Sequence, residues 1–123
     1  MNIITSKDEI SNILCEIDKP SLQRIDKSYY KDIEYIHCIV DFKLLSRFEL
    51  DKLDYISIDE SLIIHSSRII IYIKSSIDLL KADVETITDT VSIKTNYLDY
   101  HINWQVDFDY DSDKFDLALI FVE

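Results

Sequence analysis

The sequence contains no glycine, one proline and two cysteines among its 123 residues. Without glycine the chain cannot form the glycine-rich loops that bind nucleotide phosphates, and it cannot form the nucleophile elbow of a serine hydrolase. Turns that need a positive φ angle are expected to use Asn or Asp instead. Cys15 and Cys38 have no CxxC spacing, so they predict small buried side chains rather than a disulfide framework.

Long apolar runs are also absent, because no stretch approaches the ~18 residues that a membrane-spanning helix needs. The N-terminal residues lack the layout of a signal peptide. Alanine occurs twice and arginine three times, whereas isoleucine occurs 22 times. This bias indicates an AT-rich coding genome, as in a low-GC bacterium or a virus. We therefore expect a protein of the cytoplasm of a bacterium or of a virus-infected host cell, without a membrane partner.

Residues with catalytic chemistry are few and scattered. His37, His65 and His101 lie far apart in the chain, and no two of them have the short spacing of a metal site. Cys38 directly follows His37, but neighbours in a strand point to opposite faces, so they cannot act together as nucleophile and base. We expect a protein that is not an enzyme and that needs no cofactor and no metal ion.

Helix and strand signals are clear in the N-terminal part. Ser6 and Glu9 have the spacing of a capping box, and apolar residues follow at helical spacing, which predicts a helix at 6–18. Pro20 favours the end of that helix, because the residue before a proline is pushed out of the helical region. Other elements predicted from apolar spacing are an edge strand within 1–5, a short helix within 21–29 and an interior strand at 33–42.

Residues 59–81 fit two patterns. Steps of three and four alternate along a series that is apolar except for Ser66, namely Ile63, Ser66, Ile70, Ile73, Ile77 and Leu80, and this spacing is typical of a helix. Alternatively, SLIIH and RIIIYIK would be strands on either side of Ser66–Ser67, because β-branched residues favour strands. A Ser-Ser pair is a poor hairpin turn, so we favour one long helix. The Thr-rich segment 84–93 predicts a half-exposed strand.

The last 23 residues predict a hairpin. Apolar and polar residues alternate along 101–110 and again along 115–123, so each segment has one apolar face. A turn at 111–114 would bring the two apolar faces together and place Trp104 opposite Phe121. A slip of one residue would expose every apolar side chain, so the pattern itself specifies this register.

A chain of this length has the size of one domain, residues 1–123, with a core that needs no disulfides. A turn at Asn96–Tyr97 would join the predicted strand at 84–93 to the hairpin. The predicted fold class is α+β, with a mostly antiparallel sheet, a C-terminal β-meander or hairpin, and two or three helices packed on one face.

Negative charge is concentrated at the C-terminal end. Seven acidic residues and one base, Lys114, lie between Asp99 and Glu123, which is a net charge of −6 out of −11 for the chain. A calcium loop that began at the first of the alternating aspartates would need Gly and Glu where Ser112 and Ala118 stand, so no dedicated metal site is predicted. The predicted partner-binding residues are Asp107, Asp109, Asp111, Asp113 and Asp116.

An acidic sheet face of this kind favours association with a basic protein and repels nucleic acid. We therefore expect a small inhibitor or immunity-type protein, such as an anti-defence protein, that binds a nuclease or another nucleic-acid-handling protein. The simpler interpretation is a solvated face that keeps an edge hairpin from aggregating.

A structural or oligomeric subunit of a viral or bacterial assembly is the alternative function. Ile120 and Val122 form a largely apolar second face on the last predicted strand. If no helix covers that face, a homodimer would form through this strand or through the Ile-rich segment 63–77.

Overall fold

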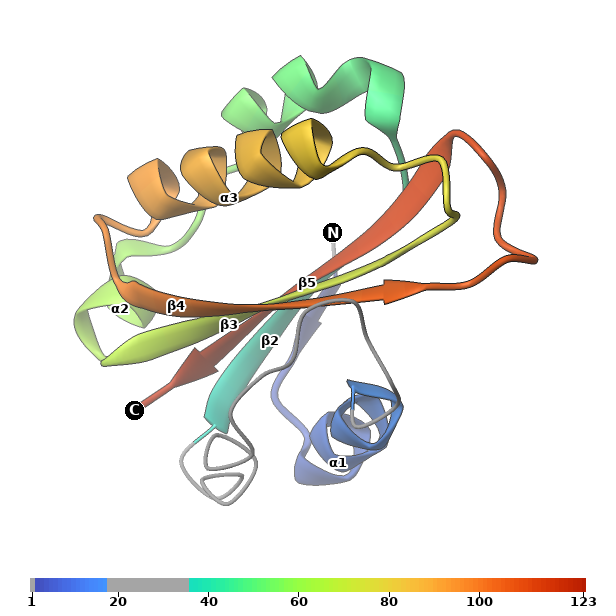
Figure 1. The fold of residues 1–123 in the computed structure, drawn as a ribbon. Helices are drawn as coiled ribbons and strands as arrows, with labels where there is room; N and C mark the ends of the chain where they lie inside the picture. Colours follow the sequence, from blue (N-terminus) through green and yellow to red (C-terminus); the bar gives the residue numbers. More distant parts are fainter. Residues whose placement is uncertain (1, 18–35) are drawn as a thin grey trace.

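The computed structural model describes residues 2–17 and 36–123, which form a five-stranded sheet with helices on both faces (Figure 1). One face carries α3 and the 3-10 helix η2, and the opposite face carries α1. In chain order the described elements are β1 (Asn2–Ile4), α1 (Lys7–Ile17), β2 (Ile36–Ser46), η2 (Arg47–Tyr55), α2 (Glu60–Ile64), β3 (Arg68–Ser75), α3 (Lys81–Lys94), β4 (Asp99–Val106) and β5 (Lys114–Val122).

The strand order is β1-β2-β5-β3-β4, and only the pair β3–β4 is parallel. The mixed, mostly antiparallel sheet with helices confirms the predicted α+β class. Two parallel neighbours need a crossover connection rather than a hairpin, and α3 provides it. Two or three helices were predicted on one face, and the described helices occupy both faces, because Ile10 of α1 and Ile87 of α3 belong to different cores on opposite faces.

The predicted C-terminal hairpin is also wrong, because β4 and β5 are not neighbours. Strand β3 lies between them and pairs with both. Trp104 lies next to Ile73 of β3, while Phe121 lies next to Cys38 and Ile69. The alternation correctly assigned Trp104 and Phe121 to one core, but it could not show that a third strand separates them.

The predicted long helix at 59–81 is wrong. Only Glu60–Ile64 is helical, and Arg68–Ser75 forms β3, as the second of the two patterns predicts for RIIIYIK. From Ile69 to Ile73 every side chain is buried, because both faces of this central strand are covered. A run that is apolar at every position also contains steps of three and four, which explains why the helical pattern was misleading.

The predicted strand at 84–93 is a helix, α3. Its buried residues Val84, Ile87 and Val91 follow the helical spacing of three and four. At its start, the side chain of Asp83 accepts a hydrogen bond from the Leu80 amide at 2.9 Å. Tertiary packing onto the sheet outweighs the strand preference of the Thr-rich sequence.

Several predictions are confirmed. Helix α1 and edge strand β1 lie within one or two residues of the predicted ranges, and β2 is an interior strand between β1 and β5. Asn96 and Tyr97 form the predicted turn, and both have positive φ angles, 55° and 61°. The short helix predicted within 21–29 lies outside the described residues.

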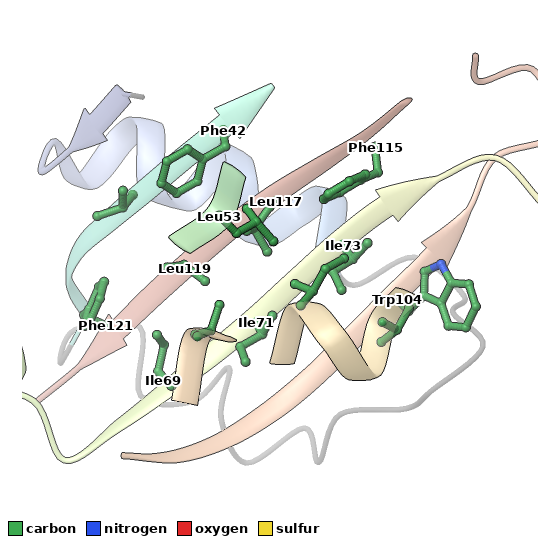
Figure 2. Close-up of a cluster of buried hydrophobic side chains, with 14 of the residues drawn as sticks. Phe42, Leu53, Ile69, Ile71, Ile73, Trp104, Phe115, Leu117, Leu119 and Phe121 are labelled. Atoms are coloured by element: carbon green, nitrogen blue, oxygen red, sulfur yellow. The ribbon is translucent and has the colours of Figure 1, made fainter. Parts of the chain in front are cut away.

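The larger core lies between the sheet and the layer formed by α3 and η2. Figure 2 shows side chains from β2, β5, β3 and β4 pointing into this layer from one face of the sheet. Trp104 is buried there, as predicted, and its indole N–H donates to Ser75 Oγ at 2.8 Å. The residues labelled in Figure 2 are Phe42, Leu53, Ile69, Ile71, Ile73, Trp104, Phe115, Leu117, Leu119 and Phe121.

Candidate functional site

The predicted acidic residues lie mostly in the loop 107–113, which connects β4 to β5. Because β3 separates these strands, the connection must cross the end of β3, a distance of about two strand spacings or ~10 Å. Figure 1 shows this loop extending beyond the end of the sheet. Asp109 and Asp111 are exposed, whereas Asp107 and Asp113 are partly buried. Four of the five predicted binding residues are thus brought together.

The loop 107–113 also carries an exposed apolar residue, Phe108. Phe108 is 78% exposed, although the alternation along 101–110 placed it on the apolar face of the predicted hairpin. The reason is that β4 ends at Val106, so the alternation no longer applies beyond it. The acidic loop therefore presents an aromatic ring between aspartates.

Hydrogen bonds hold the acidic loop in one conformation. The amide of Asp109 donates to the Asp107 carboxylate at 3.0 Å, which forms an Asx turn. The Ser76 hydroxyl donates to the carbonyl of Ser112 at 3.1 Å, and the Arg47 amide donates to the carbonyl of Asp113 at 2.9 Å. The loop is tied to the ends of β2 and β3, so its aspartates are presented on an ordered scaffold.

Asp116, the fifth predicted residue, is not part of this surface. It is only 8% exposed and faces the side of the sheet that α1 covers. Its carboxylate accepts a 2.9 Å hydrogen bond from the amide of Leu44 and another from the Tyr110 hydroxyl. Leu44 sits in a bulge of β2 with a positive φ angle of 54°, an unfavourable angle for leucine. Asp116 is therefore an anchor for the bulge and the acidic loop.

A second buried carboxylate, Asp41 of β2, lies close to Asp116. Lys43 Nζ is 3.7 Å from a carboxylate oxygen of each. Burial raises the pKa of Asp41 above its usual value, and the negative charge of Asp116 adds to the rise, while Lys43 opposes it. The sequence carried no signal for this pair, because Asp41 and Asp116 meet only through the pairing of β2 with β5.

Beside the pair Asp41 and Asp116, further polar residues lie on β3, on β4 and in the acidic loop. Lys74 lies 4.0 Å from the Asp107 carboxylate and 5.9 Å from the centre of the Tyr110 ring. Burial, together with the bond to Asp116, raises the pKa of Tyr110. The hydroxyl of Tyr72 donates to Gln105 at 2.9 Å. Tyr110 thus links the acidic loop to the buried pair of carboxylates.

The predicted oligomer interface at Ile120 and Val122 is wrong. Both side chains are fully buried, because β5 is an interior strand with β2 and β3 on either side. In the Ile-rich segment 63–77, Ile69 to Ile73 are buried in β3, whereas Ile64 and Ile77 are 69% and 62% exposed. The strand residues of both segments are therefore no surface for a second copy, and self-association through the exposed ends of 63–77 stays a prediction.

His37 and Cys38, two residues with catalytic potential, are neighbours in β2. His37 Nε2 lies 2.8 Å from Ser66 Oγ, but that hydroxyl donates to the carbonyl of Leu62 at 2.6 Å. The serine proton is therefore directed away from His37, which acts as the donor in this pair. Cys38 is buried, as predicted, and burial raises the pKa of its thiol. Within residues 2–17 and 36–123, no group of three His, Cys, Asp or Glu side chains could hold a metal ion.

Two of the hollows on the surface lie entirely on described residues. The first, of about 440 Å³, lies at the start of β4, where Tyr97, Asp99 and Tyr100 contribute to its wall. The second, of about 250 Å³, lies between β2, η2 and the start of β5 and has a more apolar wall. Ser92 and His101 also line the first hollow, and Ser46, Glu49 and Lys52 line the second. The first combines aromatic rings with a carboxylate, a set that can bind a cationic side chain.

No protein-family model matches this chain, and no curated protein is significantly similar to it. No helix in the described ranges has the length and apolar character needed to cross a membrane.

Proposed function

We propose that this protein is a non-enzymatic binding protein that engages a basic protein partner through the acidic loop 107–113. The observation that carries this proposal is the position of Phe108, an exposed aromatic residue between aspartates on an ordered loop. Buried aromatic anchors dominate the energy of protein interfaces, and surrounding charges steer the partner. The loop supplies both kinds of residue.

The ordering of the loop favours binding, because little conformational freedom remains to be lost when a partner docks. Within the loop, the Tyr110 hydroxyl is bonded to the buried carboxylate of Asp116. Ser76 and Arg47 donate hydrogen bonds to the carbonyl groups at the end of the loop. A loop that served only for solubility would not need these bonds. The interpretation as a solvated acidic surface nevertheless makes a different prediction, namely that removing the charges leaves every interaction unchanged.

The chemistry of the partner follows from the charge. A net charge of −11 repels the phosphates of nucleic acid, so the partner is a protein with a basic surface. Proteins that handle nucleic acid carry such surfaces, so the proposed target is a nuclease or another nucleic-acid-binding protein. The proposed role is that of an inhibitor or immunity protein in the cytoplasm.

The proposal is tested by affinity capture from lysate of the cells that produce the protein. Three immobilised proteins are compared: wild type, a loop variant with Phe108→Ala, Asp109→Asn and Asp111→Asn, and a control with Asp51→Asn and Asp54→Asn. The control removes two negative charges, as the loop variant does, but at exposed positions of η2. We expect one basic protein to be recovered by wild type and control and at least tenfold less by the loop variant.

Binding of the recovered protein is then measured with purified components at low and high salt. Association should slow markedly as ionic strength rises, because salt screens the steering charges. Equal recovery of every protein by wild type and loop variant would contradict the proposal. So would tight binding of duplex DNA to the wild-type protein.

A further inference from the structure

Strand β4 forms one margin of the sheet (Figure 1). It pairs with β3 over eight consecutive residues without a register shift, and no other strand of the described ranges pairs with its outer side. The opposite margin is β1, which has only three residues. An edge strand of eight regular residues is a template for another extended chain.

The backbone groups that face outward can be identified from the pairing. The Asp107 amide donates to the Ser75 carbonyl of β3 at 2.8 Å, so odd-numbered residues of this stretch direct their backbone groups toward β3. Backbone groups alternate along a strand, so those of Tyr100, Ile102 and Trp104 point away from the sheet. These residues would donate to and accept from an added strand.

Three features that commonly protect an edge, namely lysine or arginine residues, proline and a bulge, are missing from residues 100–106 of β4. Residues 100–106 contain no lysine, arginine or proline, and no bulge interrupts the strand. Natural edges are commonly blocked by such features. Their absence over seven residues is expected where the edge is used for binding.

Acidic groups lie at both ends of the uncharged stretch. At the start of β4, Asp99 lies with Tyr97 and Tyr100 in the wall of the 440 Å³ hollow. At the other end, Asp107 begins the acidic loop. The two ends are separated by eight residues, about 26 Å of extended chain. The edge therefore fits an uncharged strand with a basic residue at each end.

A second copy of the chain does not meet this requirement. Antiparallel pairing of two β4 strands about a central two-fold axis would place Asp99 of each copy opposite Asp107 of the other. Like charges directly opposite one another destabilise a strand pair. The charge pattern thus selects a basic partner over self-association.

We infer that β4 accepts an extended segment of the basic partner as a sixth strand, in the manner of β-strand addition. The backbone of Tyr100, Ile102 and Trp104 binds the added strand, and its flanking Lys or Arg residues contact Asp99 and the acidic loop. The hollow beside Tyr97 and Tyr100 receives one of the cationic side chains through aromatic faces and a carboxylate. This inference rests on the proposed function and specifies how the partner is bound.

The test uses three synthetic peptides and fluorescence anisotropy. The first peptide, KKTVTVTVTKK, has seven uncharged strand-forming residues between lysine pairs. The second replaces each Val with Pro, which preserves the charge but removes the ability to pair as a strand. The third replaces the lysines with glutamates. We expect the first peptide to bind at least tenfold more tightly than either of the others.

Two protein variants locate the binding. Tyr100→Pro removes one outward amide at an edge position where proline is tolerated, and Tyr100→Ala retains that amide as a control. We expect Tyr100→Pro to weaken the first peptide at least tenfold relative to Tyr100→Ala. Amide hydrogen exchange of the wild type provides a readout that needs no variant, since bound peptide should slow exchange at Tyr100, Ile102 and Trp104.

The possible results separate this inference from the proposed function. Equal binding of the Val and Pro peptides would overturn strand addition while leaving the acidic surface as a binding site. Failure of both lysine peptides to bind would overturn strand addition, and the capture experiment with the loop variant would judge the proposed function independently. Protection of the three amides in a peptide-free dimer would show that a second copy occupies the edge and would also overturn the inference.

Discussion

Strands β4 and β5 supply side chains to the same core, yet their surroundings differ. Strand β5 lies between β2 and β3, and every residue of it after Lys114 is buried. Strand β4 has one neighbour among the described strands, and only its residues 103–105 are buried. The difference shows that the number of neighbours, rather than the apolar content of a strand, decides how much of it can face a partner.

The largest difference in unfolding free energy is expected when one lysine is introduced into β5 and, in a separate variant, into β4. Ile120→Lys would bury an ammonium group at the centre of the sheet, and we expect it to cost more than about 4 kcal/mol of unfolding free energy. Tyr100→Lys, at a residue that is 42% exposed on β4, should cost less than about 1 kcal/mol. Urea denaturation followed by circular dichroism measures both. A stable, monomeric Ile120→Lys protein would contradict the central position of β5.

A smaller difference in unfolding free energy is expected between variants of Asp116 in β5 and variants of the aspartates in the loop 107–113. Asp116→Ala removes the acceptor of the Leu44 amide and of the Tyr110 hydroxyl, and we expect a loss of about 1–3 kcal/mol. Asp109→Ala, at an exposed position of the loop, should change stability by no more than about 0.5 kcal/mol. Denaturation midpoints of the two variants give the comparison. Equal losses would mean that the loop aspartates are structural rather than available for binding.

The smallest effect concerns the pH dependence of the buried pair beside β5. Burial raises the pKa of Asp41 above its ordinary value of 3.8 in the folded protein, so the folded state binds this proton more tightly than the unfolded state. The contribution of Asp41 to stability is therefore most favourable below pH 3.8 and declines as the pH rises through its folded pKa.

Asp41→Asn removes this titration. The stability of the variant relative to wild type should therefore increase as the pH is raised from about 3.5 to 7, as measured by urea denaturation at several pH values. Asp51→Asn, on the exposed surface of η2, serves as the control and should show no such trend. A pH-independent difference between Asp41→Asn and wild type would show that Lys43 fully compensates for burial.

Local features of the chain were predictable from sequence. The capping box of Ser6 and Glu9 and the apolar spacing after it identified α1, and the two apolar faces of the segment around Cys38 identified an interior strand. Alternation along β4 and β5 assigned Trp104 and Phe121 to one core. The clustering of aspartates from Asp107 to Asp113 was also visible, because it needs only the chain order.

By itself, the sequence determined which face of β4 and which face of β5 point into the larger core, because burial of one face depends on the local period of the pattern. Only the tertiary structure decided which strands are neighbours, because pairing brings together residues that are distant in the chain. The insertion of β3 between β4 and β5 moved Ile120 from a predicted edge to the centre of the sheet. The same insertion turned the expected tight turn into a long crossing loop and left the backbone of β4 at the margin.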